Sequence, residues 1–136
     1  MKPQVSLIIR TLNEAKHLGD LLNSIRSQTY KNFEIVLVDS GSFDGTLEIA
    51  EKYCDKILEI KQDEFTFGFA LNFGIKHAAG DLIGIISAHT IPLHDNWLKF
   101  LVNGFCENGK DEKIAMTYGK QLGTEMSNFS EKSDFE

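Results

Sequence analysis

Short apolar runs alternate along the chain with segments whose apolar residues recur at helical spacing. The runs VSLIIR (residues 5–10), FEIVLV (33–38), KILEI (56–60) and LIGIIS (82–87) predict β-strands, and a last short strand is predicted over 115–118. Helices are predicted over residues 15–28, 46–53, 70–79 and 95–106. Because strand and helix alternate with short connections, the pattern predicts a three-layer α/β/α sandwich with a mostly parallel sheet.

Local signals set the boundaries of these elements. Asn13 is expected to cap the first helix, and Gly80 to follow the end of the third. Residues 62–69 are rich in phenylalanine and are expected to form a loop. The phenylalanines of this region are expected to pack in the core or the loop rather than to form a base-stacking platform; they are Phe65, Phe67, Phe69 and Phe73.

Polar side chains follow three of the predicted strands. They are Thr11, Asn13, Asp39, Asp44, Ser87 and His89. In an open parallel sheet, ligands bind beyond the carboxyl ends of the strands. We therefore expect these side chains to form a ligand site at one edge of the sheet.

Asp39 ends an apolar strand and is followed by the turn SGSFDG. A carboxylate there can accept hydrogen bonds from ribose hydroxyls or from the N3–H of uracil or thymine, whereas cytosine has an acceptor at that position. Gly41 and Ser42 are small enough to let a ligand approach the backbone. In the alternative interpretation Asp39 forms an Asx-turn and Asp44 caps the next helix.

Composition narrows the class of protein. The 136 residues are 42% hydrophobic and 25% charged, which fits one globular domain. The net charge of −6, without any cluster of Lys or Arg, argues against a nucleic-acid surface. No apolar stretch approaches the ~20 residues of a membrane span, and no signal peptide is evident. With Cys54 and Cys106 interpreted as reduced thiols, we expect a cytoplasmic protein, with the inner face of the membrane as another location.

Other nucleotide-binding classes fit poorly. The first predicted strand is followed by TLNEAKHL, which contains neither the dinucleotide motif GxGxxG nor a P-loop. A receiver domain would need an acid pair after that strand, and a nucleotidyltransferase would need a Gly/Arg-rich loop there. Neither is present.

Four segments together resemble the nucleotide-binding half of family 2 glycosyltransferases, which have the GT-A fold. The segments are VSLIIRTLNEAKHL, FEIVLVDSGSFDGT, FGFALNFGIKHAAGDLIGIISAH and PLHDNWL. The resemblance implies a donor-binding domain over residues 1–121, and the chemistry of Asp39 favours a UDP- or dTDP-sugar. The variant SAHxxP followed by YGKQ is similar to a bacterial subgroup of cell-surface glycan enzymes that includes rhamnosyltransferase-like members.

The resemblance implies roles for single positions in the first two loops. Thr11 and Asn13 would lie in the loop around the nucleotide base, and Asp39 would contact the base or the ribose. Ser40 stands where many relatives have a second Asp. Asp44 matches the second acid of the motif, whose role is more structural.

Two departures from the family pattern concern the diphosphate of the donor. Ser87, Ala88 and His89 fall where the family's Asp-X-Asp holds a metal and the diphosphate, so both acids are missing. Phe69 stands where relatives often have an Arg, while Asn72 remains as a donor-side residue. These changes weaken the expected Mg²⁺ or Mn²⁺ site and leave three interpretations of His89: a metal ligand, a hydrogen-bond donor to the diphosphate, or a structural histidine.

The resemblance also implies a second half that holds the acceptor. In the family, that half supplies the base that deprotonates the acceptor hydroxyl during an inverting displacement. Residues 122–136 look like an acidic tail at the start of a truncated acceptor half, so the catalytic base stays unknown and we expect little turnover from this chain alone.

The expected function is the donor-binding part of an inverting glycosyltransferase that acts on a glycan or a lipid-linked acceptor. The alternative is a non-catalytic module that binds a nucleotide or a nucleotide-sugar. Exposed apolar surface and a homo-oligomer are also expected, because the missing half would otherwise cover one side of the domain.

Overall fold

The computed structural model describes residues 2–105 and 114–123. The chain divides into two compact units, Met1–Asn96 and Trp97–Glu136. The first unit contains the sheet and three of the α-helices, and the second contains helix α4 (Trp97–Asn103). Cys106 and most of the predicted acidic tail lie outside the described residues.

The predicted parallel sheet is confirmed. Within the described residues it has four strands in the order β3-β2-β1-β4, which are β1 (Val5–Thr11), β2 (Phe33–Asp39), β3 (Lys56–Glu59) and β4 (Leu82–Ser87). All the pairings are parallel. Nearly every residue of β1 and β2 is buried, which explains why these central strands are continuous apolar runs rather than alternating ones.

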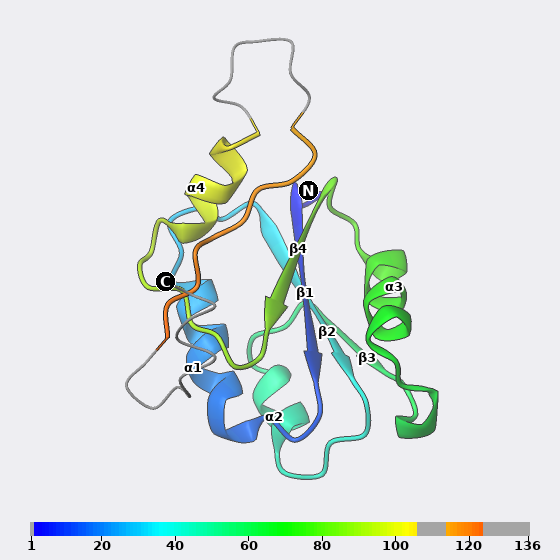
Figure 1. Ribbon diagram of the computed structural model, residues 1–136. Coiled ribbons are helices and arrows are strands. Elements are labelled where there is room, and N and C mark those ends of the chain that lie inside the picture. The colour runs from blue at the N-terminus through cyan, green and yellow to red at the C-terminus, as the bar shows by residue number, and fades with distance from the viewer. Residues whose placement is uncertain (1, 106–113, 124–136) are drawn as a thin grey trace. The chain divides into compact units, whose positions relative to one another are not determined.

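Helices lie on both sides of the sheet, as Figure 1 shows. On one side are α1 (Ala15–Arg26) and α2 (Thr46–Ala50), which contact each other. The buried residues of α1 are Leu18, Leu21, Leu22 and Ile25. On the other side, α3 (Phe67–His77) packs against β1 and β2. This arrangement confirms the predicted α/β fold.

Helix α3 lies close to the sheet because a glycine faces it. A Cβ added at Gly74 would be 2.7 Å from Cγ2 of Ile8 and 3.0 Å from Cγ2 of Val38. Phe65 and Phe73 pack against the same apolar cluster, as predicted for core phenylalanines.

The prediction was wrong for the other two phenylalanines and for the start of α3. The helix begins at Phe67, because the Thr66 side chain caps it by accepting a hydrogen bond from the Phe69 N–H. Phe67 and Phe69 therefore lie in the first turn and are 67% and 43% exposed.

Other predicted boundaries were also wrong. The α1 N-cap residue is Glu14 and makes no side-chain cap, whereas Asn13 has a left-handed backbone (φ 54°). Helix α1 ends at Arg26 and α2 at Ala50, two and three residues before the predicted ends. Residues 115–118 form no strand. Within residues 2–105 and 114–123, no helix has the length and apolar character needed to cross a bilayer.

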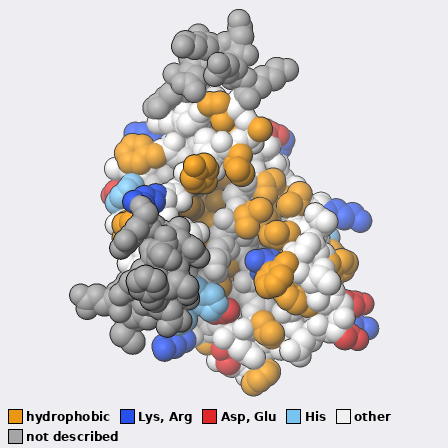
Figure 2. All heavy atoms as spheres, viewed as in Figure 1, with side chains coloured by type: hydrophobic (Ala, Val, Ile, Leu, Met, Phe, Trp, Pro, Cys, Tyr) orange, Lys and Arg blue, Asp and Glu red, His pale blue; other side chains and the backbone are white. Residues whose placement is uncertain are grey.

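Exposed apolar side chains gather over β4 and α3, on the face that Figure 2 shows. Strand β4 is an edge strand of the described sheet, and its Ile83 and Ile85 are exposed, as are Phe67 and Phe69 of α3. The expectation of exposed apolar surface is therefore confirmed, and self-association stays a prediction.

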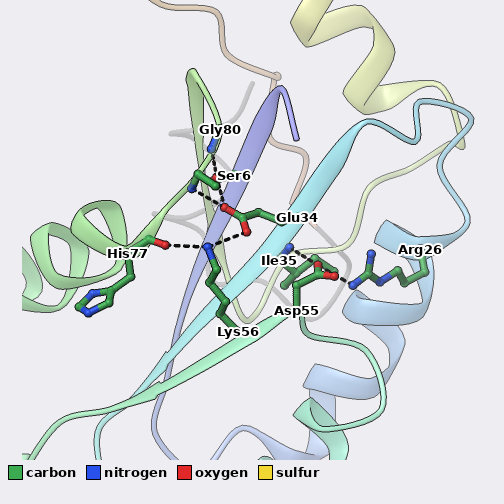
Figure 3. Close-up of polar contacts among 9 residues, drawn as sticks. Ser6, Arg26, Glu34, Ile35, Asp55, Lys56, His77 and Gly80 are labelled. Carbon is green, nitrogen blue, oxygen red and sulfur yellow. Dashed lines mark hydrogen bonds and ion pairs between the residues drawn. The ribbon is translucent and has the colours of Figure 1, made fainter. Parts of the chain in front are cut away.

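A buried carboxylate connects the amino ends of the strands. Glu34 in β2 accepts hydrogen bonds from the Ser6 hydroxyl (2.5 Å) and the Ala79 N–H (2.6 Å). Its other oxygen is 3.0 Å from Nζ of Lys56. Figure 3 shows these side chains converging from β1, β2, β3 and the connection before β4. This network lies at the amino ends of the strands, whereas the predicted ligand site lies at their carboxyl ends.

Candidate functional site

The carboxyl ends of β1, β2 and β4 bring the predicted site residues to one edge of the sheet. Thr11 is the register partner of Asp39 across β1 and β2. Arg10 is the partner of Ser87 across β1 and β4. The strand-end residues of three chain segments therefore form one rim, as expected for a parallel sheet.

Asp39 is fully buried, and both of its carboxylate oxygens are engaged within the rim. Oδ1 accepts hydrogen bonds from the hydroxyls of Thr11 (2.7 Å) and Ser42 (2.6 Å). Oδ2 accepts from the N–H groups of Gly41 (3.0 Å) and Ser42 (2.8 Å). A carboxylate offers about four acceptor positions, so this arrangement uses all of them. In this geometry Asp39 fixes the turn that follows β2.

Asn13 joins the loop after β1 to the loop after β2. Its side-chain oxygen accepts from the Phe43 N–H (2.9 Å), and its own N–H donates to the Ser42 hydroxyl (2.8 Å). Ser40 adds two hydrogen bonds to the Thr11 carbonyl, one from its N–H and one from its hydroxyl. The predicted base-binding loop is therefore held in place by the Asp39 loop, and Asn13 serves this purpose instead of capping α1.

The start of α1 is capped from a distant part of the chain. The Thr46 hydroxyl accepts from the Glu14 N–H (2.9 Å), and Asp44 Oδ2 accepts from the Ala15 N–H (3.1 Å). Hydrogen bonding by the Thr46 hydroxyl is the main cause that lowers the pKa of Asp44 below its ordinary value. Asp44 Oδ1 also accepts from the N–H and the hydroxyl of Thr46, the first residue of α2, so Asp44 contacts the start of both helices. Its role at the donor stays a prediction.

The segment after β4 places His89 against an acid from another loop. His89 Nε2 is 3.1 Å from Oε1 of Glu14, and the His89 side chain is largely exposed while that of Glu14 is not. The His17 ring lies edge-on to the His89 ring, with 6.0 Å between centroids. Ala88 is buried and Ser87 is exposed. The contact with Glu14 was not predicted, because residues so far apart in sequence carry no local signal of contact.

Two further residues complete the description of the rim. Asn72 is exposed in the second turn of α3 and is not part of the hydrogen-bonded cluster around Asp39. Arg10, which the sequence analysis did not single out, has its guanidinium over the Phe67 ring at 4.4 Å. Its only signal in the sequence is a charge within an apolar strand.

Residues 6–127 match the glycosyl transferase family 2. The chain belongs to this family. The bacterial subgroup suggested by the SAHxxP pattern stays a prediction.

Two curated relatives illustrate how much of the family pattern is present. An uncharacterized glycosyltransferase of Rickettsia typhi is 36% identical over 116 residues, which are 85% of this chain and 36% of the relative. Glycosyltransferase AglE of Haloferax volcanii is 35% identical over 115 residues, which are 80% of this chain and 38% of the relative. The chain thus spans little more than a third of the length of these relatives.

Solved structures show the same fold. S. aureus TarS 1–349 matches with a TM-score of 0.69 and 27% identity over 76% of this chain and 32% of TarS, and TarS has also been solved with UDP-GlcNAc. Mannosyltransferase PcManGT from Pyrobaculum calidifontis, solved with GDP-Man and Mn²⁺, matches with a TM-score of 0.68 and 27% identity over 79% of this chain and 34% of PcManGT. The chain therefore has the Rossmann-like GT-A arrangement of these neighbours.

The side chains described here do not fit a Mg²⁺ or Mn²⁺ site. Within residues 2–105 and 114–123, no group of three His, Cys, Asp or Glu residues could hold a metal ion. Mg²⁺ prefers oxygen ligands, whereas the position after β4 offers an imidazole whose Nε2 faces Glu14. Asp39 and Asp44 are engaged by hydrogen-bond donors of their own loops.

Cys54 does not add a reactive group to this site. Burial raises the pKa of its thiol to about 12, so little thiolate is present at neutral pH. Among the described residues Cys54 is a free thiol, and because Cys106 lies outside them the expectation of two reduced thiols stays a prediction.

Proposed function

We propose that this chain is the donor-binding part of an inverting glycosyltransferase that uses a UDP- or dTDP-sugar. The acceptor would be a cell-surface glycan or a lipid-linked saccharide. The observation that carries the proposal is the rim at the carboxyl ends of β1, β2 and β4, in a chain that belongs to glycosyl transferase family 2. TarS, a structural neighbour, has been solved with UDP and with UDP-GlcNAc, which supports a uridine nucleotide as the donor.

Different residues of the rim would contact different parts of the nucleotide-sugar. The two loops joined by Asn13 and Asp39 would form the rigid wall against which the base and ribose lie. Gly41, with its left-handed backbone (φ +99°), would let the nucleotide approach this wall closely. His89, with Nε2–H directed at Glu14, would as an imidazolium donate a hydrogen bond to the diphosphate from Nδ1. The base that deprotonates the acceptor would come from outside the described residues.

The proposal predicts nucleotide binding at the rim. Titration calorimetry with UDP, dTDP, GDP and CDP is expected to give the tightest binding for UDP or dTDP, with a dissociation constant at or below about 1 mM. His89→Ala should weaken UDP binding by roughly threefold to tenfold, since a hydrogen bond to a charged group contributes about 1 kcal/mol or more. His77→Ala is the matched control, because His77 lies at the far end of α3.

Two outcomes would contradict this prediction. Absence of heat with all four nucleotides would reject donor binding. Equal weakening by His89→Ala and His77→Ala would show that the histidine at the rim has no special role. If UDP binds but the full-length protein transfers no sugar, the alternative of a non-catalytic nucleotide-binding module would be favoured.

A second prediction concerns the metal. Because the described carboxylates at the rim are committed to hydrogen bonds or to His89, we expect UDP affinity in EDTA to stay within about threefold of that in Mg²⁺ or Mn²⁺. The titration is repeated at equal ionic strength with each metal and with EDTA. A loss of tenfold or more in EDTA would show that the diphosphate is bound through a metal.

The cytoplasmic location expected from the sequence stays a prediction.

A further inference from the structure

Arg10 is a cation placed near the carboxyl end of the central strand β1. Its register partners are Val38 in β2 and Ser87 in β4. Paired residues of a parallel sheet share a face, and Ile8, two positions earlier, faces Gly74 of α3. Arg10 therefore lies at the rim on the α3 side of the sheet, where its ring contact with Phe67 also places it.

The guanidinium of Arg10 is only partly satisfied. Its Nη1 is buried and has no hydrogen-bond partner among the described residues. The Phe67 ring supports one face of the group, with 4.4 Å between Cζ and the ring centroid, but a ring face accepts no in-plane hydrogen bond. A guanidinium has five N–H donors and stays charged, so leaving one buried and unpaired is costly.

Arg26 shows how a structural arginine of the same chain is satisfied. It donates to the Tyr53 carbonyl, forms an ion pair with Asp55 (2.8 Å), and has its guanidinium over the Phe33 ring at 5.4 Å. Both arginines are thus supported by an aromatic ring. Arg26 also has the Asp55 carboxylate and the Tyr53 carbonyl as hydrogen-bond acceptors. The buried Nη1 of Arg10 has no such oxygen acceptor among the described residues.

The nearby acids are engaged elsewhere. Asp39 accepts four hydrogen bonds from Thr11, Gly41 and Ser42. Glu14 is paired with His89. Neither of these two carboxylates is therefore an acceptor for the buried Nη1 of Arg10, which suits an anion that arrives from solution. A planar fork of donors matches two oxygens of a phosphate group.

We propose that Arg10 binds the diphosphate of the nucleotide-sugar donor alongside His89, with its guanidinium oriented by Phe67. This inference rests on the proposed function, since it names a contact within the donor site. The charge of Arg10, together with His89 on the other side of the rim, compensates the diphosphate where the described residues supply no metal-binding acids. The exposed Phe67 supports the Arg10 guanidinium with its ring.

The test compares ligands that differ only in their phosphates. UDP, UMP and uridine are titrated into the wild-type chain, Arg10→Met and Arg10→Lys. Arg10→Met keeps an unbranched side chain over Phe67 but removes the charge, so we expect UDP affinity to fall tenfold or more while uridine affinity changes less than twofold. Arg10→Lys should lie between, because it keeps the charge and loses the fork. Lys76→Gln, an exposed charge removal at the far end of α3, is the matched control and should change neither affinity.

Each outcome decides the inference. Unchanged UDP affinity in Arg10→Met, or an equal loss for UDP and uridine, would overturn the role of Arg10 and leave the proposed function intact. A wild-type chain that binds none of the three ligands would overturn both. Thermal unfolding without ligand is measured in parallel. If Arg10→Met is unfolded, Arg10→Lys decides: weaker UDP binding with unchanged uridine binding supports the inference, and unchanged binding of both overturns it.

Discussion

Asp39→Ala is expected to lower the free energy of unfolding by about 3 kcal/mol, because hydrogen bonds to a buried charge contribute about 1.5–3 kcal/mol each and their loss leaves buried donors unpaired. The substitution removes the acceptor for the N–H groups of Gly41 and Ser42 and for the hydroxyl of Thr11. The midpoint of thermal unfolding should fall by roughly 10 °C for a chain of this size. The turn after β2 and the loop that Asn13 attaches to it should become disordered together, so UDP binding should also be lost.

Asp39→Asn separates the role in the loop from a role at the ligand. An asparagine can keep its oxygen on the two backbone N–H groups and donate from its amide nitrogen to the hydroxyls of Thr11 and Ser42, which can both accept. We expect a cost of about 1 kcal/mol, because neutral hydrogen bonds replace charge-assisted ones. Uridine affinity should stay within about threefold of wild type. Circular dichroism and uridine titration measure the two quantities on the same sample.

The result that would contradict this view is a folded Asp39→Asn variant whose uridine affinity is reduced tenfold or more. That result would restore the direct contact with base or ribose that the sequence suggested. Ser24→Ala serves as a control for substitution of a polar residue at a different place on the first unit.

The strands were predictable from the sequence because each is a short apolar run. In the central strands FEIVLV and VSLIIR, almost every side chain is buried by helices on both sides, so hydrophobicity alone marks them. The rim that we propose as the ligand site followed from parallel pairing, which places Thr11 beside Asp39. The order of the strands and the family resemblance agree with a parallel sheet of the GT-A type.

The start of α1 could not be predicted in the same way, because its caps come from a distant part of the chain. Asn13 has the residue type of a cap, yet it bonds to Phe43 in the next loop. The N–H groups of Glu14 and Ala15 at the start of α1 are satisfied by Thr46 and Asp44, more than 28 residues away in sequence. Contacts of this kind depend on the folded positions of both loops and leave no periodic pattern in the sequence.

Charged residues inside apolar strands were the other features that sequence reasoning passed over. Arg10 ends the run SLIIR and Glu34 is the second residue of the run FEIVLV, and both read as minor interruptions of a strand. In the structure Arg10 lies near the carboxyl ends of the strands and Glu34 near their amino ends. Glu34 has partners for both of its oxygens, whereas Arg10 has a buried nitrogen without one. The difference between a satisfied and an unsatisfied charge separates a residue that stabilises the fold from one available to a ligand.

The second large effect is expected at Glu34. Glu34→Ala should lower the free energy of unfolding by about 3 kcal/mol, because each buried donor left without its acceptor costs roughly 1–3 kcal/mol. The Glu34 carboxylate accepts from Ser6 and Ala79 and faces Lys56, which also donates to the His77 carbonyl. Removing it would leave the Ser6 hydroxyl and the Ala79 N–H without an acceptor. Urea unfolding followed by circular dichroism at pH 7 gives the change.

Glu34→Gln adds a pH dependence to this prediction. Burial acts to raise the pKa of Glu34, but hydrogen bonds from Ser6 and Ala79 and the charge of Lys56 outweigh it, and the pKa lies below its ordinary value of 4.5. The stability that ionised Glu34 contributes is therefore present above about pH 4.5 and is lost as the pH falls through the lowered pKa. The stability gap between wild type and Glu34→Gln should be largest at neutral pH and should narrow in more acidic buffer.

Glu59→Gln is the matched control, because Glu59 is exposed at the end of β3 in the same sheet. Its stability should equal that of wild type at both neutral and acidic pH, since an exposed carboxylate gains little from folding. A gap for Glu34→Gln that stays constant from neutral to acidic pH would show that shape, not charge, makes Glu34 important. A gap as small as that of Glu59→Gln at neutral pH would show that the network at the amino ends of the strands contributes no stability.

Because the N–H groups of Ala79 and Gly80, just before β4, are hydrogen-bonded to Glu34 and Ser6, loss of the network should loosen the pairing of β4 with β1 before that of β2 with β1. Hydrogen exchange of the β4 amides in Glu34→Gln would then increase more than that of the β2 amides, which connects this network to the strand that carries Ser87 and His89 to the rim.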